Sequence, residues 1–180
     1  MELSLQVQQK QILSQKMQQS VEILQMNAVT LSEYIREFAE ENPLVEWNEE
    51  TEREIQDMIN EGITSFKLYM TYPAMIVDDG DLYKIIKKLN EYGCFAGVHC
   101  ENAGAIDALI AEAKKEGRLG PENHPLVRPD IMEAEAVHRL LVIAKEAGAP
   151  VMVVHLTNRK ALEEVRRARK EGQTVYAETC

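Results

Sequence analysis

Apolar residues follow two different spacings along the chain, and the change falls near residue 50. In the first part they recur every three or four positions, which is the spacing of one face of an α-helix. Asn42 ends this pattern, because a residue before proline disfavours the helical region. The pattern predicts two helices, residues 6–26 and 31–42. Their apolar stripes should face a common partner surface and consist of Leu13, Met17, Val21, Leu24, Ile35 and Phe38.

From residue 51 onward, short apolar runs alternate with amphipathic stretches, as in strands that alternate with helices. The runs predict strands at Ser65–Met70, Phe95–His99, Val151–His155 and Thr174–Glu178. The stretches between them predict helices at Asp79–Tyr92, Ala103–Lys115, Ile131–Ala147 and Arg159–Lys170, with a Gly- and Pro-containing loop over 120–129. Nearly continuous apolar strands indicate a parallel sheet buried on both faces. The fold class is therefore α/β, with four strands from a barrel or a small doubly wound sheet.

Composition supports a boundary near residues 46–52. Eight of the first 25 residues are Gln, and no Gly precedes Gly62. We therefore divide the chain into a helical hairpin over 1–50 and an α/β domain over 51–180. Two thin stripes bury little by themselves, so the hairpin is either docked on another structure or an interaction module for another protein.

The net charge, the lack of long apolar runs and the cysteine spacing limit the partners and the location that we expect for this chain. The formal net charge is −10, and no strong basic patch stands out, so we expect no direct nucleic-acid contact. No apolar run reaches the roughly 18 residues of a membrane span, and the N-terminus has no secretory signal pattern. Three cysteines without a Cys-x-x-Cys spacing indicate reduced thiols and a cytoplasmic location.

Three polar residues lie where parallel barrels have their active-site residues, at or near the carboxyl ends of strands. Lys67 interrupts an apolar strand, and His99 and His155 close two others. A single His at a strand end is more often a packed core or capping residue, but two at equivalent positions strengthen a functional interpretation. Burial would disfavour the charged form of Lys67, and a neutral lysine can be modified into an anionic ligand. The three residues thus form a candidate metal cluster pointing to one end of the sheet.

The N-terminal segment resembles the start of an RpoN-type (nitrogen-regulation class) bacterial sigma factor. The resemblance covers about residues 1–48 and rests on Leu3 and Leu5, the run Ile23-Leu24-Gln25-Met26, and the closing run ENPLVE at 41–46. It implies contact with core RNA polymerase and with an activator ATPase. The core-binding and promoter-binding regions of that family are not found in the 180 residues.

Residues 55–180 are similar to the dihydropyrimidinase/hydantoinase family of cyclic amidohydrolases. The motifs are SFKLYMTY at 65–72, VHCEN at 98–102, VVH at 153–155, VYAETC at 175–180, and an R-P-x-x-x-E-x-E run with Arg128, Glu133 and Glu135, which we interpret as structural. The resemblance implies a metal-dependent hydrolase of the TIM-barrel type that opens dihydropyrimidine or hydantoin rings. It implies two zinc ions, bridged by a carbamylated Lys67 and ligated by His99 and His155, with Tyr72 stabilising the oxyanion.

Departures from the family pattern bear on activity. The four histidines, at 99, 124, 138 and 155, contain no H-x-H pair, and the sequence stops at Cys180, before the Asp that serves as ligand and base. Cys100 follows His99 and could ligate zinc, but a thiol there is more often a packing residue. We therefore expect the chain alone to be inactive and to self-associate over its open strand edges. The alternative is a polymerase- or activator-binding segment fused to a structural half-barrel.

Overall fold

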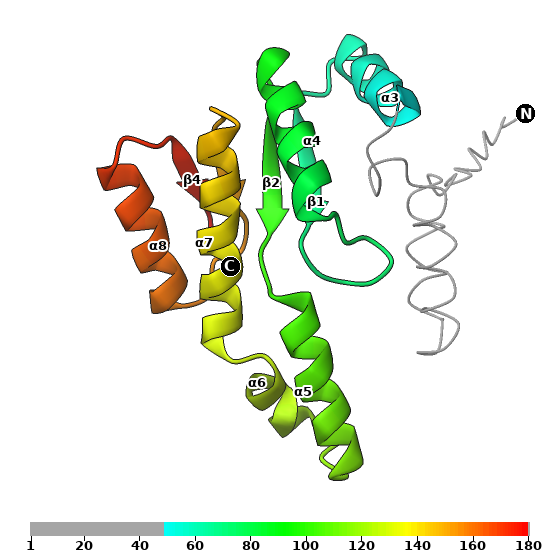
Figure 1. Ribbon diagram of the computed structural model, residues 1–180, viewed down its shortest axis with the longest axis vertical. Coiled ribbons are helices and arrows are strands. Elements are labelled where there is room, and N and C mark those ends of the chain that lie inside the picture. The colour runs from blue at the N-terminus through cyan, green and yellow to red at the C-terminus, as the bar shows by residue number, and fades with distance from the viewer. Residues whose placement is uncertain (1–48, 180) are drawn as a thin grey trace, which may run out of the picture. The chain divides into compact units, whose positions relative to one another are not determined.

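The computed structural model describes residues 49–179, and the helices expected within residues 1–48 lie outside this range. The described residues form a four-stranded parallel sheet in the order β1-β2-β3-β4, with helices between the strands (Figure 1). The strands are β1 Ser65–Tyr69, β2 Phe95–His99, β3 Val151–Val153 and β4 Val175–Ala177. The helices are α3 Glu49–Asn60, α4 Asp79–Glu91, α5 Ala103–Lys115, η2 Pro121–Asn123, α6 His124–Val127, α7 Asp130–Glu146 and α8 Arg159–Lys170.

This arrangement confirms the predicted partial (β/α) barrel with four parallel strands. Two strands and all four predicted helices keep or nearly keep the predicted bounds, whereas β3 and β4 are shorter than expected. The helix α3 was not predicted, and the expected loop over 120–129 contains the short helices η2 and α6. Pro121 and Pro125 start these helices rather than prevent them, since proline is tolerated in a first helical turn.

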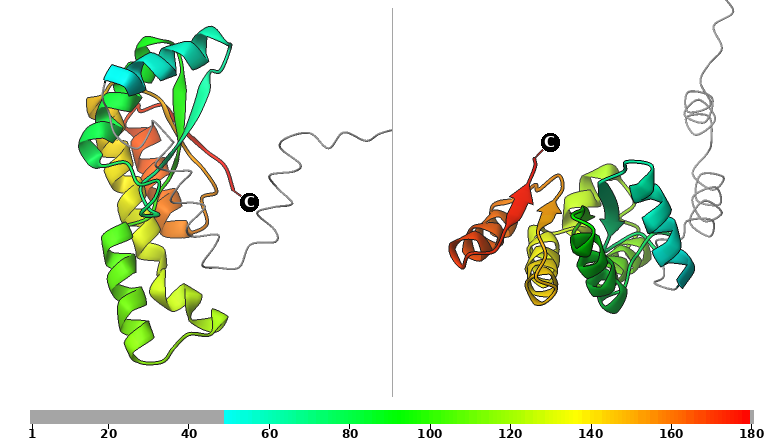
Figure 2. Two further views of the ribbon diagram at one scale, coloured as in Figure 1. Left: turned by 90° about the vertical axis from the view of Figure 1, so that its right-hand side faces the viewer. Right: turned by 90° about the horizontal axis from the view of Figure 1, so that it is seen from above.

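The core lies between one face of the sheet and the helices. Along β1, Phe66 and Leu68 are buried while Ser65 and Lys67 are exposed, the alternation of a strand with only one covered face. The helices α4, α7 and α8 lie on that covered face (Figure 2). Their largest fully buried residues include Leu82, Ile85, Leu89, Leu140 and Val165. No described helix has the length and apolar character to cross a membrane.

The expectation that both faces of the sheet are buried is wrong for the described residues. The helices cover only one face, and Tyr176 on β4 keeps 52% of its surface exposed on the other. The related expectation that Lys67 is buried inside its strand is also wrong, because its side chain projects from the uncovered face. The apolar run around Lys67 suggested burial, but only every second residue of that run lies on the covered face of the sheet, and Lys67 lies on the other.

Candidate active site at the carboxyl ends of β2 and β3

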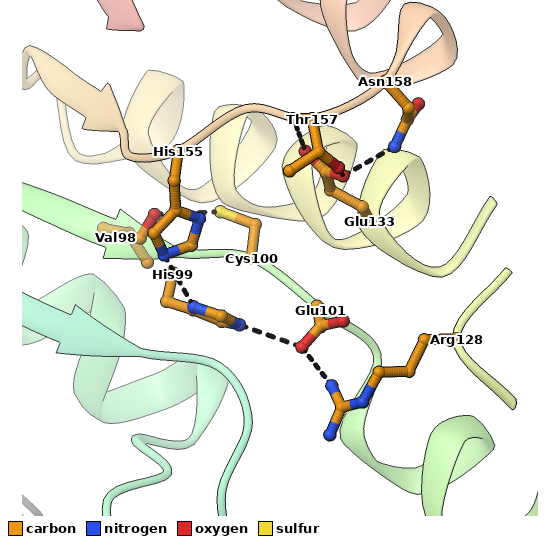
Figure 3. A network of polar contacts seen from close by, with 9 residues as sticks. All are labelled: Val98, His99, Cys100, Glu101, Arg128, Glu133, His155, Thr157 and Asn158. Atoms are coloured by element: carbon orange, nitrogen blue, oxygen red, sulfur yellow. Dashed lines mark hydrogen bonds and ion pairs between the residues drawn. The ribbon is translucent and has the colours of Figure 1, made fainter. Parts of the chain in front are cut away.

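The predicted histidines meet at the carboxyl ends of two neighbouring strands. His99 is the last residue of β2, and His155 follows β3 by two residues. Nδ1 of His99 lies 2.9 Å from Nε2 of His155, and Nε2 of His99 lies 2.9 Å from Oε2 of Glu101 (Figure 3). An ionised carboxylate only accepts, so Nε2 of His99 carries the proton. In the neutral tautomer, Nδ1 of His99 then accepts a hydrogen bond from Nε2 of His155.

Glu101 continues this chain to Arg128, whose Nη1 donates to the same carboxylate oxygen. Burial raises the pKa of Glu101, but the hydrogen bonds from His99 and Arg128 outweigh it and hold that pKa below its usual range. His99 is only 9% exposed. The four side chains therefore form one connected polar network on a largely buried imidazole.

Tyr72 lies against this network. Its ring centroid is 5.0 Å from that of His99, and the guanidinium carbon of Arg128 is 5.8 Å from the Tyr72 ring centroid. Partial burial and the charge of Glu101 raise the pKa of the Tyr72 hydroxyl, so it stays protonated and able to donate. A cavity of about 350 Å³ opens beside these groups, and its lining includes Tyr72, His99, Glu101, Arg128 and His155.

Two residues of the cavity wall have backbone angles that favour glycine. Tyr72 has φ 68° and His155 has φ 39°. Non-glycine residues in this region cost free energy and cluster at functional sites. The loop after His155 is held by the Glu133 carboxylate. It accepts hydrogen bonds from the backbone amide of Thr157 (2.9 Å), from the Thr157 hydroxyl and from the side-chain amide of Asn158 (2.6 Å). These contacts position the segment that carries His155.

Lys67 lies two residues away from the register position of His99. It pairs with Gly97 on β2, whereas Tyr69 pairs with His99. Its Nζ is 4.9 Å from the Tyr69 ring centroid, and the Tyr69 and His99 rings are stacked 5.9 Å apart. Neighbouring residues partly desolvate the Lys67 amine, and this outweighs the charge of Glu178 and lowers the pKa of Lys67, although its side chain is exposed. Lys67 does not line the cavity, so the structure unites Tyr72, His99 and His155 but leaves Lys67 beside them.

Cys100 follows His99 and also lines the cavity, but its thiol is buried. It is 3% exposed, its Sγ lies 3.5 Å from the carbonyl oxygen of Val98, and burial raises the pKa of its thiol far above the usual value. A buried neutral thiol is a packing residue and a poor metal ligand. The structure therefore agrees with the packing interpretation.

The described residues do not by themselves fit a pair of metal ions. Both ring nitrogens of His99 are engaged, one with His155 and one with Glu101. No three His, Cys, Asp or Glu side chains within residues 49–179 are grouped so that they could hold a metal ion. Two imidazoles and a displaced lysine fall short of the closed donor set that such a centre needs. We therefore derive no reaction step through a metal.

Sequence reasoning missed the part that Glu101 and Arg128 play at this site. Both belong to motifs quoted above, and Arg128 was interpreted as structural. The signal that could have found them is a carboxylate two residues after a strand-end His, because carboxylates commonly orient imidazoles. Nothing in the sequence pairs that carboxylate with an Arg 27 positions later.

Comparison with known proteins relates the larger part of the chain to the cyclic amidohydrolases named above. The chain is 42% identical over 134 residues to a D-hydantoinase of Streptomyces coelicolor and 38% identical over 134 residues to a dihydropyrimidinase of Dictyostelium discoideum. These matches cover 74% and 73% of the chain but 29% and 27% of the relatives. The larger part of the chain is homologous to a segment of the hydantoinase and dihydropyrimidinase family.

Solved structures of hydantoinases share the fold described above. A D-hydantoinase from a Bacillus species superposes with a TM-score of 0.74 at 36% identity, and a dihydropyrimidinase from Brevibacillus agri with 0.74 at 35%. Each comparison covers 76% of this chain and 30% of the solved one. The chain thus spans less than a third of the length of the hydantoinases it matches.

The first residues match a different family. Residues 2–47 match the activator interacting domain of the sigma-54 factor. This confirms the resemblance of the N-terminal segment to the start of a nitrogen-regulation sigma factor. Two unrelated family segments therefore follow one another in the sequence, the second being the hydantoinase-like segment.

Proposed function

We propose that the hydantoinase-like segment carries part of an active site that hydrolyses a C–N bond in cyclic amides, opening a dihydropyrimidine or hydantoin ring, and that the 180-residue chain alone is inactive. The observation that supports this most strongly is the pair formed by His99 and His155, 2.9 Å apart at neighbouring strand ends. Active sites of barrels of this class gather at that end.

The proposed roles follow the family motifs. Tyr72 is the proposed hydrogen-bond donor to the developing oxyanion, supported by its raised pKa and its position on the cavity wall. Lys67, carbamylated, is the proposed bridging ligand, supported by the lowered pKa that favours its neutral amine. His99 and His155 are the proposed ligands of zinc in a complete site, which needs further ligands and a base from outside the described residues.

A chimera tests the substrate class. In it, the hydantoinase-like segment replaces the matching segment of the Streptomyces coelicolor D-hydantoinase, which shares 42% of its residues. We expect hydrolysis of hydantoin or dihydrouracil, lost on His155→Ala and reduced in kcat on Tyr72→Phe. Lys114→Ala, on the exposed surface of α5, is the matched control and should leave the rate unchanged. A folded, zinc-loaded chimera without turnover would overturn the proposal.

The inactivity of the chain alone needs a separate assay. The chain is purified with zinc and bicarbonate, and dihydrouracil hydrolysis is measured beside the Lys67→Ala variant. We expect no difference between the two, because removing part of a cooperating catalytic set removes most of the rate. Clear turnover that Lys67→Ala abolishes would show that the chain is a complete enzyme.

A second candidate function rests on the family match over residues 2–47. We propose that this segment binds an activator ATPase or core RNA polymerase in the cytoplasm. Leu13→Asp with Leu24→Asp should abolish capture of polymerase by the full chain, because both residues belong to the predicted apolar stripe. Gln19→Asp, off that stripe, is the control. Equal capture by all variants would contradict binding through the stripe.

A further inference from the structure

One sheet face and both outer strands are uncovered within residues 49–179. The uncovered face carries a row of paired residues, Lys67, Gly97, Met152 and Tyr176, one from each strand. Tyr176 is 52% exposed, and its ring is tilted against that of Phe95 with the ring centroids 6.0 Å apart. A sheet face buries its apolar residues only when another layer packs on it.

The outer edge of β4 is open to another strand. In a parallel ladder, alternate residues bond to opposite neighbours. The Thr174 carbonyl and the Glu178 amide bond to β3, so Val175 and Ala177 direct their backbone groups outward. The Nε of Arg169 donates to the Val175 carbonyl at 2.7 Å and covers part of this edge.

The outer edge of β1 is likewise only partly covered. The Val77 amide donates to the Tyr69 carbonyl at 2.9 Å, at the carboxyl end of the strand. No other strand pairs with this edge among the residues that the structure describes. Both edges thus retain backbone groups that an incoming strand can use.

The helices beside these two edges carry opposite charge. The helix α3 lies at the β1 side of the sheet and α8 at the β4 side (Figures 1 and 2). The α3 sequence EETEREIQDMIN has five acids and one base, whereas the α8 sequence RKALEEVRRARK has six bases and two acids. Oε2 of Glu54, on α3, is a buried carboxylate oxygen without a hydrogen-bond partner. One edge is therefore acidic and the other basic.

A groove of about 600 Å³ runs along the basic edge. Its lining combines apolar residues, among them Leu156, Leu162 and Ala177, with the cationic Arg159 and Arg166. Apolar and cationic side chains together fit an amphipathic acidic helix such as α3, whose Met58 and Ile59 are only partly buried.

We propose that a second copy of this chain covers these surfaces, with the α3–β1 edge of each copy against the α8–β4 edge of the other. Two sets of four parallel strands then close an eight-stranded barrel around a two-fold axis, and the uncovered faces become its interior. Arg169 releases the Val175 carbonyl to the incoming strand. The proposal sharpens the expected self-association; it rests on the fold and not on the proposed activity.

Charge reversal on the two edges tests this arrangement. One variant of the full chain carries Arg159→Glu and Arg166→Glu on the α8 edge, and another carries Asp57→Lys and Glu61→Lys on the α3 edge. All four side chains are exposed. Sedimentation equilibrium should give the unaltered chain twice the 20.4 kDa of one copy. Each variant alone should dissociate more than about tenfold more readily, because both of its interfaces then join like charges.

A mixture of the two charge-reversal variants tests the arrangement most sharply. In a heterodimer both interfaces again join opposite charges, so the equimolar mixture should recover the dimer mass. Lys114→Glu with Lys115→Glu, exposed on α5 and away from both edges, is the matched control and should stay dimeric. Circular dichroism confirms that each variant is folded.

Three results would overturn the proposal. The first is a monomeric unaltered chain, and the second is a mass that keeps growing with concentration, as in an open array of edges. The third is a mixture of folded variants that remains monomeric. Each can occur whether or not the chimera hydrolyses hydantoin, so the two proposals fail separately.

Discussion

The two faces of the sheet differ in burial and in the kind of side chain they present, although the same strands form both. On the helix-covered face, Phe66, Leu68, Val98, Val151 and Val153 are at most 6% exposed. On the other face, Lys67 and Tyr176 are exposed, and the polar network begins where that face ends, at His99. The covered face accounts for the stability of the segment, and the uncovered face and its carboxyl end hold the groups available for chemistry and association.

The largest expected effect separates two neighbouring residues on β1. Leu68→Ala removes a side chain that is 1% exposed and should lower the free energy of unfolding by about 2–5 kcal/mol. Lys67→Ala, on the opposite face, should lower it by less than about 0.5 kcal/mol. Urea denaturation measures both, in the Arg159→Glu, Arg166→Glu background so that contact between copies does not contribute. Equal losses would show that both faces are packed alike.

A smaller effect is expected from the anchor behind His155. Glu133→Ala leaves three donors on Thr157 and Asn158 without their acceptor and should cost about 1–3 kcal/mol of unfolding free energy. The control Glu116→Ala, in an exposed ion pair with Arg118 away from both sheet edges, should cost no more than about 0.5 kcal/mol. If the two variants lose the same amount, the Glu133 contacts do not hold the loop.

The smallest effect concerns the polar network. Glu101→Gln removes the charge that Arg128 and His99 contact and should lower the free energy of unfolding by about 1 kcal/mol. Nitrogen NMR of the His99 ring should also change, because the protonated Nε2 loses its carboxylate acceptor. An unchanged His99 spectrum would contradict the deduced tautomer.

Much of the fold could be predicted from the sequence because its signals are local. The C-terminal ends of α4, α5 and α8 follow from amphipathic stretches that stop just before Gly93, Gly117 and Gly172, each with positive φ. The helix α3 was missed because it follows a change of composition, and its few apolar residues, such as Ile55, indicate a core contact only once α4 is placed beside it.

The candidate site was predictable only in part, because its contacts join residues far apart in the sequence. The family motifs led to His99, His155 and Tyr72, which the structure brings together. The exposure of Lys67 could not be deduced, since an apolar run of six residues does not reveal which faces of a sheet are covered.

We infer that the hydantoinase-like segment shares part of the fold of its relatives but does not by itself hold a complete metal centre. The most direct test is the zinc content of the purified chain, measured by mass spectrometry after dialysis from zinc and bicarbonate. We expect less than one tightly bound zinc ion per chain, with no change on Lys67→Ala, since His99 engages His155 and Glu101 through its two ring nitrogens. Two zinc ions per chain that are lost on Lys67→Ala would contradict this inference.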